Sequence, residues 1–413
     1  MKKKSHQIRS LVKAIDNDPE DIESVLELAD LFHGQKKYDL AQKWYETAIL
    51  IDPLCSSAHN DLGLVLEEQE KLLEAIRSYR AAITVDNEFA EAHNNLGNLL
   101  HEQGNADEAL KSYKRALRYD PKLAAAFNNI GNIKLEMGSQ ISAKKNFEKA
   151  LKIDPQMVEA CVNLGNFYKE KGNYQSSIKY YQKALEVNPD DESTKHNLNA
   201  ILGNTTKSAP LSYVREIFDE YASEFDRHLV DELEYKIPSV IKQKIDKLIP
   251  QKKWSKGLDL GCGTGICGEV FSDRVKSIVG IDVSPKMLQM SKGKKVYEKL
   301  IMGEINEVLG DINENFDFFI STDVFIYVGD LDLIFSNVKK LGKKGGLFAF
   351  STEHITTGSY LLLDSGRYAH SEIYVKDLLR FYGFDVLDFS LEGIRLEDGK
   401  WINGGVYIAE IGK

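Results

Sequence analysis

The sequence predicts a two-domain protein in which an all-α repeat array precedes an α/β domain with a mostly parallel sheet. Three observations carry this prediction: a length of 413 residues, a pattern that recurs every 34 residues in the first half, and apolar runs that alternate with helical stretches in the second half. A chain of this length exceeds one compact core of ordinary size and fits two domains of roughly 200 residues each.

Composition and charge give no support to several classes of partner and site. The formal net charge is -10, which indicates no general attraction for nucleic-acid phosphates or for an anionic membrane surface. No run of about 18 apolar residues is present, so no membrane span is expected and the expected location is the cytoplasm. The cysteines form no ligand pattern, so neither a metal site nor a disulfide framework is predicted: Cys55, Cys161, Cys262 and Cys267.

The first half contains five units in constant register. A small residue marks the same phase of each unit: Ala29, Gly63, Gly97, Gly131 and Gly165. An aromatic residue follows at a fixed distance in every unit: Tyr45, Tyr79, Tyr113, Phe147 and Tyr181. Small residues let paired helices approach closely, and the aromatic fills the space to the next pair. The pattern resembles the tetratricopeptide repeat over about residues 22–189, which implies a solenoid of helix pairs.

Single helices are expected at both ends of this array. The last carries Asn197, Leu198 and Leu202, and such end helices shield the apolar faces of a solenoid. The periodicity stops at Gly203, and the composition of residues 204–210 is typical of a linker. The predicted organisation is therefore a repeat domain at 1–203, a linker at 204–212 and a second domain at 213–413.

A row of asparagines is expected on the concave surface of the solenoid: Asn94, Asn95, Asn98, Asn128, Asn129, Asn132, Asn163 and Asn166. An asparagine side chain both donates and accepts hydrogen bonds, so such a row can pair with the backbone of an extended peptide. The array is similar to the asparagine-lined superhelix of O-linked N-acetylglucosamine transferase, which implies a protein or peptide client. The alternative is that these side chains brace neighbouring helices, and both interpretations stay open for any single residue.

The second half alternates apolar runs with helical stretches. Five runs predict parallel strands with helices on both faces of the sheet: 257–260, 277–283, 300–302, 316–321 and 346–351. Two further runs, around 385–391 and 406–411, have no helix between them and predict an antiparallel pair at the edge. A seven-stranded sheet is therefore expected.

A glycine-rich turn follows the first of these strands. It reads Asp259-Leu260-Gly261-Cys262-Gly263-Thr264-Gly265, and ligands of such sheets bind beyond the carboxyl ends of the strands. Asp282 ends the second strand about 20 residues later, where a carboxylate can accept both ribose hydroxyls. Together these features resemble the Rossmann-like class I methyltransferase fold, which implies S-adenosyl-L-methionine as the cofactor. The resemblance also places Glu304 near the adenine, although an exposed helix-cap carboxylate is the alternative there.

The resemblance extends beyond the glycine turn. Residues 218–226 look like the leading segment of ubiquinone-biosynthesis-type methyltransferases, a helix that folds over the bound cofactor. Residues 321–330, 346–353 and 365–371 are similar to a bacterial family of predicted methyltransferases that carry tetratricopeptide repeats. The cofactor-binding residues implied or suggested on these grounds are Asp259, Gly261, Cys262, Gly263, Gly265, Asp282, Glu304, Asp323, Tyr213 and Tyr221.

Methyl transfer needs few catalytic side chains, because a sulfonium methyl is already electrophilic and the enzyme must mainly align a nucleophile. If the acceptor is a hydroxyl or an acidic carbon, His370 is the expected base, with Arg367 holding a carboxylate or phosphate. The alternative is that both residues brace a long loop. Residues 321–324 lack the Asn/Asp-Pro-Pro-Tyr/Phe segment of amine methylases, which disfavours a nucleobase amine as the acceptor.

The predicted function is methyl transfer from S-adenosyl-L-methionine by a protein whose repeats recruit a client or a substrate carrier. A rival from another class is a repeat scaffold with an inactive second domain, and the presence of Gly261, Gly263, Gly265 and Asp282 argues against it. A nicotinamide-dependent oxidoreductase is a third interpretation, which calorimetry with each cofactor would distinguish.

Overall fold

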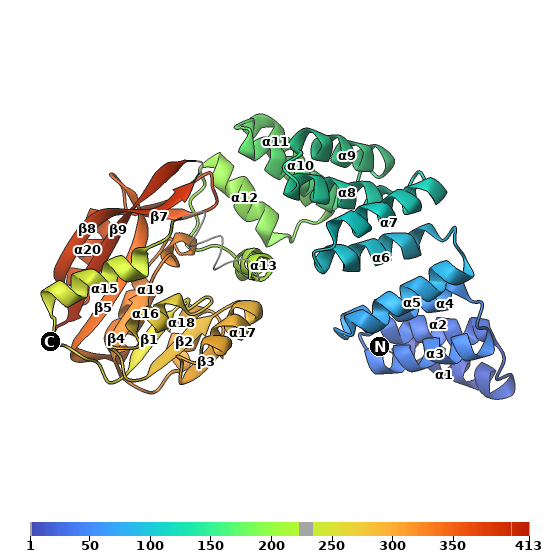
Figure 1. The fold of residues 1–413 in the computed structure, drawn as a ribbon, viewed down its shortest axis with the longest axis horizontal. Helices are drawn as coiled ribbons and strands as arrows, with labels where there is room; N and C mark the ends of the chain where they lie inside the picture. Colours follow the sequence, from blue (N-terminus) through green and yellow to red (C-terminus); the bar gives the residue numbers. More distant parts are fainter. Residues whose placement is uncertain (1, 223–233, 398, 413) are drawn as a thin grey trace. The chain divides into compact units, whose positions relative to one another are not determined.

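The computed structural model describes residues 2–222, 234–397 and 399–412, and for residues 2–5, 220 and 221 it describes the backbone alone. The chain forms two compact units, Met1–Pro189 and Asp190–Lys413 (Figure 1). Among the described residues, no helix has the length and apolar character needed to cross a bilayer.

The first unit is the predicted all-α solenoid. Helix α1 (Lys2–Asn17) precedes five helix pairs, which confirms the tetratricopeptide-repeat architecture. The pairs are α2 (Ile22–His33) with α3 (Tyr38–Ile51), α4 (Ser56–Glu68) with α5 (Leu72–Val85), α6 (Ala90–Glu102) with α7 (Ala106–Tyr119), α8 (Ala124–Glu136) with α9 (Gln140–Ile153), and α10 (Val158–Glu170) with α11 (Tyr174–Val187).

Close packing explains the small residue at the fixed phase of each repeat. A Cβ atom added to Gly131 would lie 2.4 Å from the Phe147 ring, and one added to Gly63 would lie 2.5 Å from the Tyr79 ring. Both aromatic side chains are fully buried. In these pairs the two helices are therefore too close at this point for any side chain larger than hydrogen, whereas the first pair accommodates the methyl group of Ala29.

Helix α12 (Glu192–Leu202) belongs to the second unit, whereas the sequence groups it with the repeats in a domain ending at residue 203. Its buried face packs on helix α13 (Leu211–Tyr221) and on the segment around Gly366. The apolar pattern of α12 predicts that one face is covered, but it does not say by which unit.

The second unit is built on one mixed sheet. Strands β1 (Gly257–Leu260), β2 (Ile278–Asp282), β3 (Lys299–Met302), β4 (Phe316–Ser321) and β5 (Gly342–Ile355) are parallel, in the order β3-β2-β1-β4-β5. Strand β9 (Lys400–Ile411) pairs antiparallel with β5, and β8 (Phe384–Glu397) pairs antiparallel with β9. This arrangement confirms the predicted α/β fold class.

Two short strands were not predicted. Strands β6 (Tyr360–Leu362) and β7 (Tyr368–Ser371) form an antiparallel pair, and β7 extends the sheet beside the end of β5. The described part of the sheet therefore has nine strands instead of seven. Both strands are short and no helical stretch lies between them, so the alternation of strand and helix that marks the equally short β1 and β3 is missing here.

Helices cover both faces of the sheet. One core joins β1 and β4 to α18 (Ile305–Asp311), α19 (Asp332–Leu341) and α20 (Glu372–Phe381). The other core joins β4 and β9 to α15 (Ile237–Leu248) and α16 (Ile266–Phe271). Helix α17 (Pro285–Lys294) connects β2 and β3, and the 3-10 turn η2 (Phe325–Tyr327) follows β4. The carboxyl ends of β1 and β4, where the chain turns to opposite sides of the sheet, remain open for a ligand.

Candidate active site

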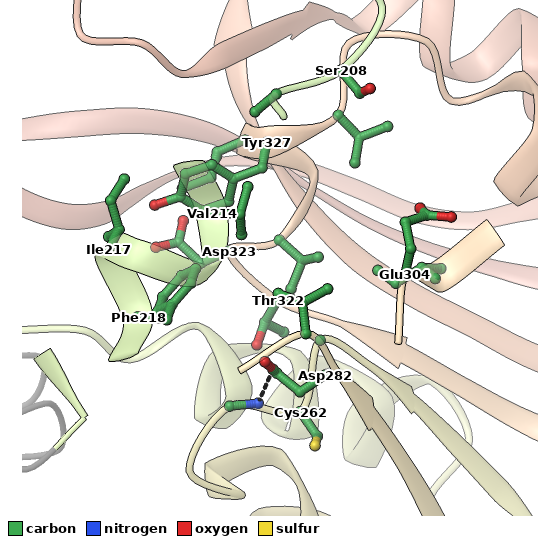
Figure 2. A pocket seen from close by; sticks show the side chains of 18 of the residues that line it. Ser208, Val214, Ile217, Phe218, Cys262, Asp282, Glu304, Thr322, Asp323 and Tyr327 are labelled. Atoms are coloured by element: carbon green, nitrogen blue, oxygen red, sulfur yellow. Dashed lines mark hydrogen bonds between the residues drawn. The ribbon is translucent and has the colours of Figure 1, made fainter. Parts of the chain in front are cut away.

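A cavity of about 710 Å³ lies at the carboxyl ends of β1, β2 and β4. Its wall includes the glycine turn after β1, Asp282 at the end of β2, Glu304 after β3 and Asp323 after β4, with helix α13 contributing apolar side chains. Figure 2 shows these residues around the cavity. Ligands of doubly wound sheets bind at this position, where the connections that follow two neighbouring strands, here β1 and β4, run to opposite faces of the sheet.

The glycine turn has a left-handed backbone that favours glycine. Gly261 has a φ of 73° and Gly263 a φ of 52°. A Cβ atom on Gly261 would lie 2.4 Å from Val324, so packing alone excludes a side chain there. A Cβ atom on Gly263 would have no neighbour within 4 Å, and Gly263 lines the cavity. The bare backbone at Gly263 therefore leaves room for a ligand to lie against it.

Asp282 points its carboxylate toward this turn. One oxygen, Oδ2, accepts a hydrogen bond from the Gly263 backbone nitrogen at 2.8 Å, and Oδ1 accepts one from the Ser284 nitrogen at 2.9 Å (Figure 2). The side chain is 8% exposed, and burial raises the pKa of its carboxyl. Because each carboxylate oxygen can accept a further bond, Asp282 fits a ligand with two neighbouring hydroxyl groups, as a ribose has.

Asp259 does not line the cavity. Its Oδ2 accepts a hydrogen bond from the Tyr297 hydroxyl at 2.6 Å, and that hydroxyl accepts one from the Gly268 nitrogen at 3.2 Å. Burial raises the pKa of Asp259 to about 7, and the nearby Asp282 carboxylate adds to the shift. The Asp259 side chain therefore lies outside the cavity wall and is linked through Tyr297 to helix α16. Gly265 also lies outside the cavity wall.

The remaining predicted cofactor residues divide into three groups. Cys262, Glu304 and Asp323 line the cavity. Glu304 also caps helix α18 by accepting a hydrogen bond from the Glu307 nitrogen at 2.9 Å, so the two interpretations of this residue are compatible. Tyr213 is buried outside the cavity wall, against the ring of His196. The side chain of Tyr221 lies outside the described residues.

A buried cluster of charges forms the end of the cavity beyond β4. Arg395 is 1% exposed and donates to three carboxylates: Asp323 at 2.8 Å, Glu397 at 2.6 Å, and Glu353. Asp323 has a φ of 59°, a strained value for a residue other than glycine. Its Oδ1 accepts the bond from Arg395, while Oδ2 has no hydrogen-bond partner among the described residues. The cluster thus holds one carboxylate oxygen ready for a ligand.

Sequence reasoning missed Arg395 and Glu353. Glu353 lies at the end of the apolar run that forms β5, and Arg395 lies beside the buried Ile394 in β8. A charged residue in a strand that is expected to be buried needs a partner of opposite charge. A charged residue within an apolar run is therefore a sequence signal of a buried ion pair, but it does not identify which distant residue is the partner.

Arg367 and His370 have different positions. Arg367 lines the cavity and pairs with Glu397 at 2.5 Å, as the bracing interpretation expects. His370 is fully buried outside the cavity wall, where its Nε2 hydrogen-bonds the Gly329 carbonyl at 3.0 Å. Burial lowers its pKa to about 4. The structure therefore does not bring His370 to the place where a base would act, because its register on the short strand β7 turns the ring into the core.

The asparagines of the first unit pair from one repeat to the next. Asn163 donates to Asn128 at 3.0 Å and to Asn132 at 2.9 Å, and Asn129 makes the equivalent bonds to Asn94 and Asn98. Asn95 donates to Asn60 in the same way. These bonds match the bracing interpretation.

Three asparagines retain a donor. Asn98, Asn132 and Asn166 each accept hydrogen bonds at Oδ1, and their Nδ2 groups have no partner among the described residues. All three are half-buried and stand 34 residues apart. Most of the row therefore braces the array, and each of the last three repeats presents one asparagine donor at the same phase.

Comparison with known proteins agrees with both architectures. Residues 258–350 match the model of a methyltransferase domain. Tetratricopeptide-repeat models match residues 22–53, 68–104, 97–138, 124–157 and 158–191.

Individual relatives match the chain only in part. A ubiquinone biosynthesis O-methyltransferase of Pelagibacter ubique is 32% identical over 109 residues, which are 26% of this chain and 45% of the relative. A malonyl-[acyl-carrier protein] O-methyltransferase of Serratia marcescens is 29% identical over 96 residues, 23% of this chain and 37% of the relative. The chain thus spans less than half the length of these relatives.

Among solved structures, an S-adenosylmethionine-dependent methyltransferase from Clostridium acetobutylicum covers 48% of this chain and 100% of its own, at 19% identity and a TM-score of 0.37. The repeat models, the methyltransferase-domain model and the strand order described above agree on one assignment. The chain joins a tetratricopeptide-repeat solenoid to a methyltransferase domain of the class I fold.

Proposed function

We propose that this chain transfers a methyl group from S-adenosyl-L-methionine to a hydroxyl-bearing acceptor, and that its repeats recruit a protein that is, or carries, that acceptor. The observation that carries the proposal is the pairing of Asp282 with Gly263 in the wall of one cavity. The printed names of the relatives above describe O-methyltransferases, which supports the choice of an oxygen nucleophile.

The residues of the cavity fit the cofactor. Asp282 would accept hydrogen bonds from the ribose hydroxyls, and the open backbone at Gly263 would lie against the methionine part. Glu304 stands after the third strand, where the adenine would lie. When bound, the cofactor supplies an electrophilic methyl group on a positively charged sulfur.

Asp323 is the best-placed base. Arg395 fixes the orientation of its carboxylate through Oδ1, so Oδ2 can take the proton of an acceptor hydroxyl as the oxygen attacks. Apolar residues of α13, Val214, Ile217 and Phe218, line the same cavity and would exclude water from the reacting atoms (Figure 2). His370 has no part in this arrangement, because it lies outside the wall.

Recruitment by the repeats would raise the local concentration of the acceptor. The Nδ2 groups of Asn98, Asn132 and Asn166 form a series of donors that suits the backbone carbonyls of an extended segment. Linking two binding modules in one chain gives effective concentrations in the millimolar range when the geometry allows both to engage. Weak contacts to the client would then suffice.

The chemical part of this proposal is tested with Asp323→Asn. The amide keeps the shape and the oxygen that faces Arg395 but cannot take a proton. We expect incorporation of isotopically labelled methyl groups from the donor into cell extract to fall by about 100-fold or more, while calorimetry shows unchanged cofactor affinity. Asp311→Asn, an exposed change at the end of α18, is the matched control. Equal incorporation by the Asp323 variant and the wild type would remove Asp323 from the role of base.

A further inference from the structure

The segment that leads from the repeats into the second unit is ordered through hydrogen bonds. Helix α12 begins at Asp191, whose carboxylate accepts bonds from the backbone nitrogens of Ser193 and Thr194, and it ends at Gly203 with a φ of 70°. Its buried face includes His196, which is 2% exposed. Residues 204–210 follow directly. The sequence predicts a linker at 204–212, but residues 204–210 make the contacts of a structural element.

His196 is bonded to the loop that carries Arg367. Its Nε2 lies 2.8 Å from the Gly366 carbonyl oxygen, and since a carbonyl accepts, Nε2 must carry the proton. The His196 ring also lies 4.6 Å from the ring of Tyr213. Gly366 has a φ of 88°, and a Cβ atom there would lie 2.6 Å from the Tyr213 hydroxyl. The carbonyl just before Arg367 is thus held by α12.

Residues 204–210 hold this loop and a second one. Thr205 and Thr206 meet β6 and β7: the Thr205 hydroxyl accepts a bond from the Leu362 nitrogen at 3.2 Å, and the Thr206 hydroxyl lies 2.5 Å from that of Tyr368. The Lys207 carbonyl accepts from the nitrogens of Gly329 and Asp330, both at 2.8 Å. The Ala209 nitrogen donates to the Tyr327 carbonyl at 2.9 Å, and Ser208 forms an antiparallel bridge with Val328.

Both loops contribute to the charged end of the cavity. The first, residues 324–330, places Tyr327 and Val328 in the wall, and the second, residues 362–368, places Arg367 there. Ser208 and Ala209 themselves line the same cavity. Residues 204–210 therefore contribute directly to the wall that includes Asp323.

We propose that α12 and residues 204–210 form a clasp that fixes the acceptor side of the cavity, with His196 as the positioning residue for Arg367. The inference rests on the proposed function only in naming this the acceptor side. Within the second unit, α12 continues directly into residues 204–210, so both parts of the clasp act on the same two loops. The clasp acts on the acceptor side alone, because its hydrogen bonds, in the part of the chain that the structure describes, do not reach the glycine turn or Asp282.

The test uses the full chain with His196→Phe, which keeps a buried ring against Tyr213 and removes the proton donor. We expect amide hydrogen exchange in residues 362–368 to become about 5- to 10-fold faster, the usual consequence of losing one hydrogen bond. Phenylglyoxal should also modify Arg367 faster, with the buried Arg274 as the internal reference. Cofactor affinity by calorimetry should stay unchanged.

Two further variants separate positioning from general destabilisation. His196→Gln restores a donor and should return the exchange of residues 362–368 toward the wild-type rate. His93→Phe is the matched control in the repeats, because His93 is equally buried, bonds the Asn87 carbonyl through Nε2 at 3.0 Å and stacks on Tyr119. It should leave residues 362–368 unaffected. If His196→Phe fails to fold, Thr206→Val is measured on the same residues.

The inference is overturned if exchange in residues 362–368 and the reactivity of Arg367 are unchanged in the folded His196→Phe protein. The same conclusion follows if exchange rises throughout the second unit and His196→Gln gives no rescue. None of these readouts needs bound cofactor. A protein that shows the expected exchange but does not bind S-adenosyl-L-methionine would uphold the clasp and contradict the proposed function.

Discussion

Two aspartates at the carboxyl ends of neighbouring strands have different surroundings. Asp282 faces the cavity and bonds to the glycine turn, whereas Asp259, which the sequence groups with it, is fully enclosed and bonded to Tyr297. Periodicity alone predicts that both lie near the end of a parallel strand. It cannot predict the side chain that covers one of them, because Tyr297 lies 38 residues away from Asp259 along the chain.

The enclosure of Asp259 predicts a pH-dependent stability. Its pKa in the folded protein is about 7, above the value of about 3.9 expected in an unfolded chain. As the pH rises, the Asp259 carboxyl therefore loses its proton in the unfolded chain before it does so in the folded protein. The free energy of unfolding consequently falls between about pH 4 and about pH 7. Asp259→Asn removes this loss of stability, because an amide does not ionise, and it keeps an oxygen that can accept the hydrogen bond from the Tyr297 hydroxyl. We expect the variant to be more stable than the wild type at pH 8 by on the order of 1–4 kcal/mol, with no such gain near pH 4.

Urea unfolding of the full chain measures this difference. In a Trp44→Phe background, the remaining tryptophans, Trp254 and Trp401, both report on the second unit. Asp311→Asn serves as the exposed control and should show no comparable gain. A wild type that is more stable than Asp259→Asn at pH 8 would mean that the Asp259 carboxylate is favoured in its charged form.

At the scale of elements, the sequence predicts those helices and strands that belong to a pattern extending over a long stretch of the chain. The five helix pairs were predicted because they recur every 34 residues, and the five parallel strands because they alternate with helical stretches over about 100 residues. The short strands β6 and β7 were not, and the position of α12 depends on His196 meeting a carbonyl 170 residues away. The charged cluster likewise joins residues from β5, β8 and the turn after β4. Contacts of this kind are set by tertiary packing and have no local signature.

The contact between Gly131 and Phe147 predicts a large effect from a small change. Gly131→Ala would place a methyl group 2.4 Å from the Phe147 ring, and overpacking of this kind costs about 1–3 kcal/mol. Thermal unfolding of the full chain, followed in the transition of the repeats, should show that loss. Gly34→Ala is the matched control, because Gly34 has a helical φ of -64° and a Cβ there would meet nothing closer than 3.4 Å.

A double-mutant cycle then isolates the contact. Phe147→Leu should cost less stability in the Gly131→Ala background than in the wild type, because the smaller side chain relieves the overlap. Equal costs in the two backgrounds would show that the two residues do not interact.

At the scale of the whole molecule, the proposal is that the repeats deliver the acceptor to the methyltransferase domain. The half-buried asparagines offer the most direct way to separate recruitment from chemistry. Replacing Asn98, Asn132 and Asn166 with aspartate keeps the oxygens that accept bonds inside the array and removes the free Nδ2 donors. The new carboxylates would also repel the carbonyls of a bound segment.

We expect this triple variant to raise the apparent Michaelis constant for the physiological acceptor, with turnover at saturation and cofactor affinity unchanged. Asn87→Asp, an exposed change in the same array, is the control and should leave the kinetics unaltered. Labelled methyl transfer into cell extract at several extract concentrations gives the comparison. Unaltered kinetics in the folded triple variant would assign the repeats to assembly or localisation instead of substrate delivery.

The central claim is that the cavity beside Asp282 binds S-adenosyl-L-methionine. Calorimetric titration of the full chain with this cofactor, beside titration with a nicotinamide dinucleotide, tests it most directly. We predict heat of binding for S-adenosyl-L-methionine alone, and an affinity weaker by ~1.5–3 kcal/mol in Asp282→Ala, the usual cost of losing hydrogen bonds to a charged group. Binding of the nicotinamide dinucleotide in its place, or an unchanged affinity in Asp282→Ala, would contradict the account.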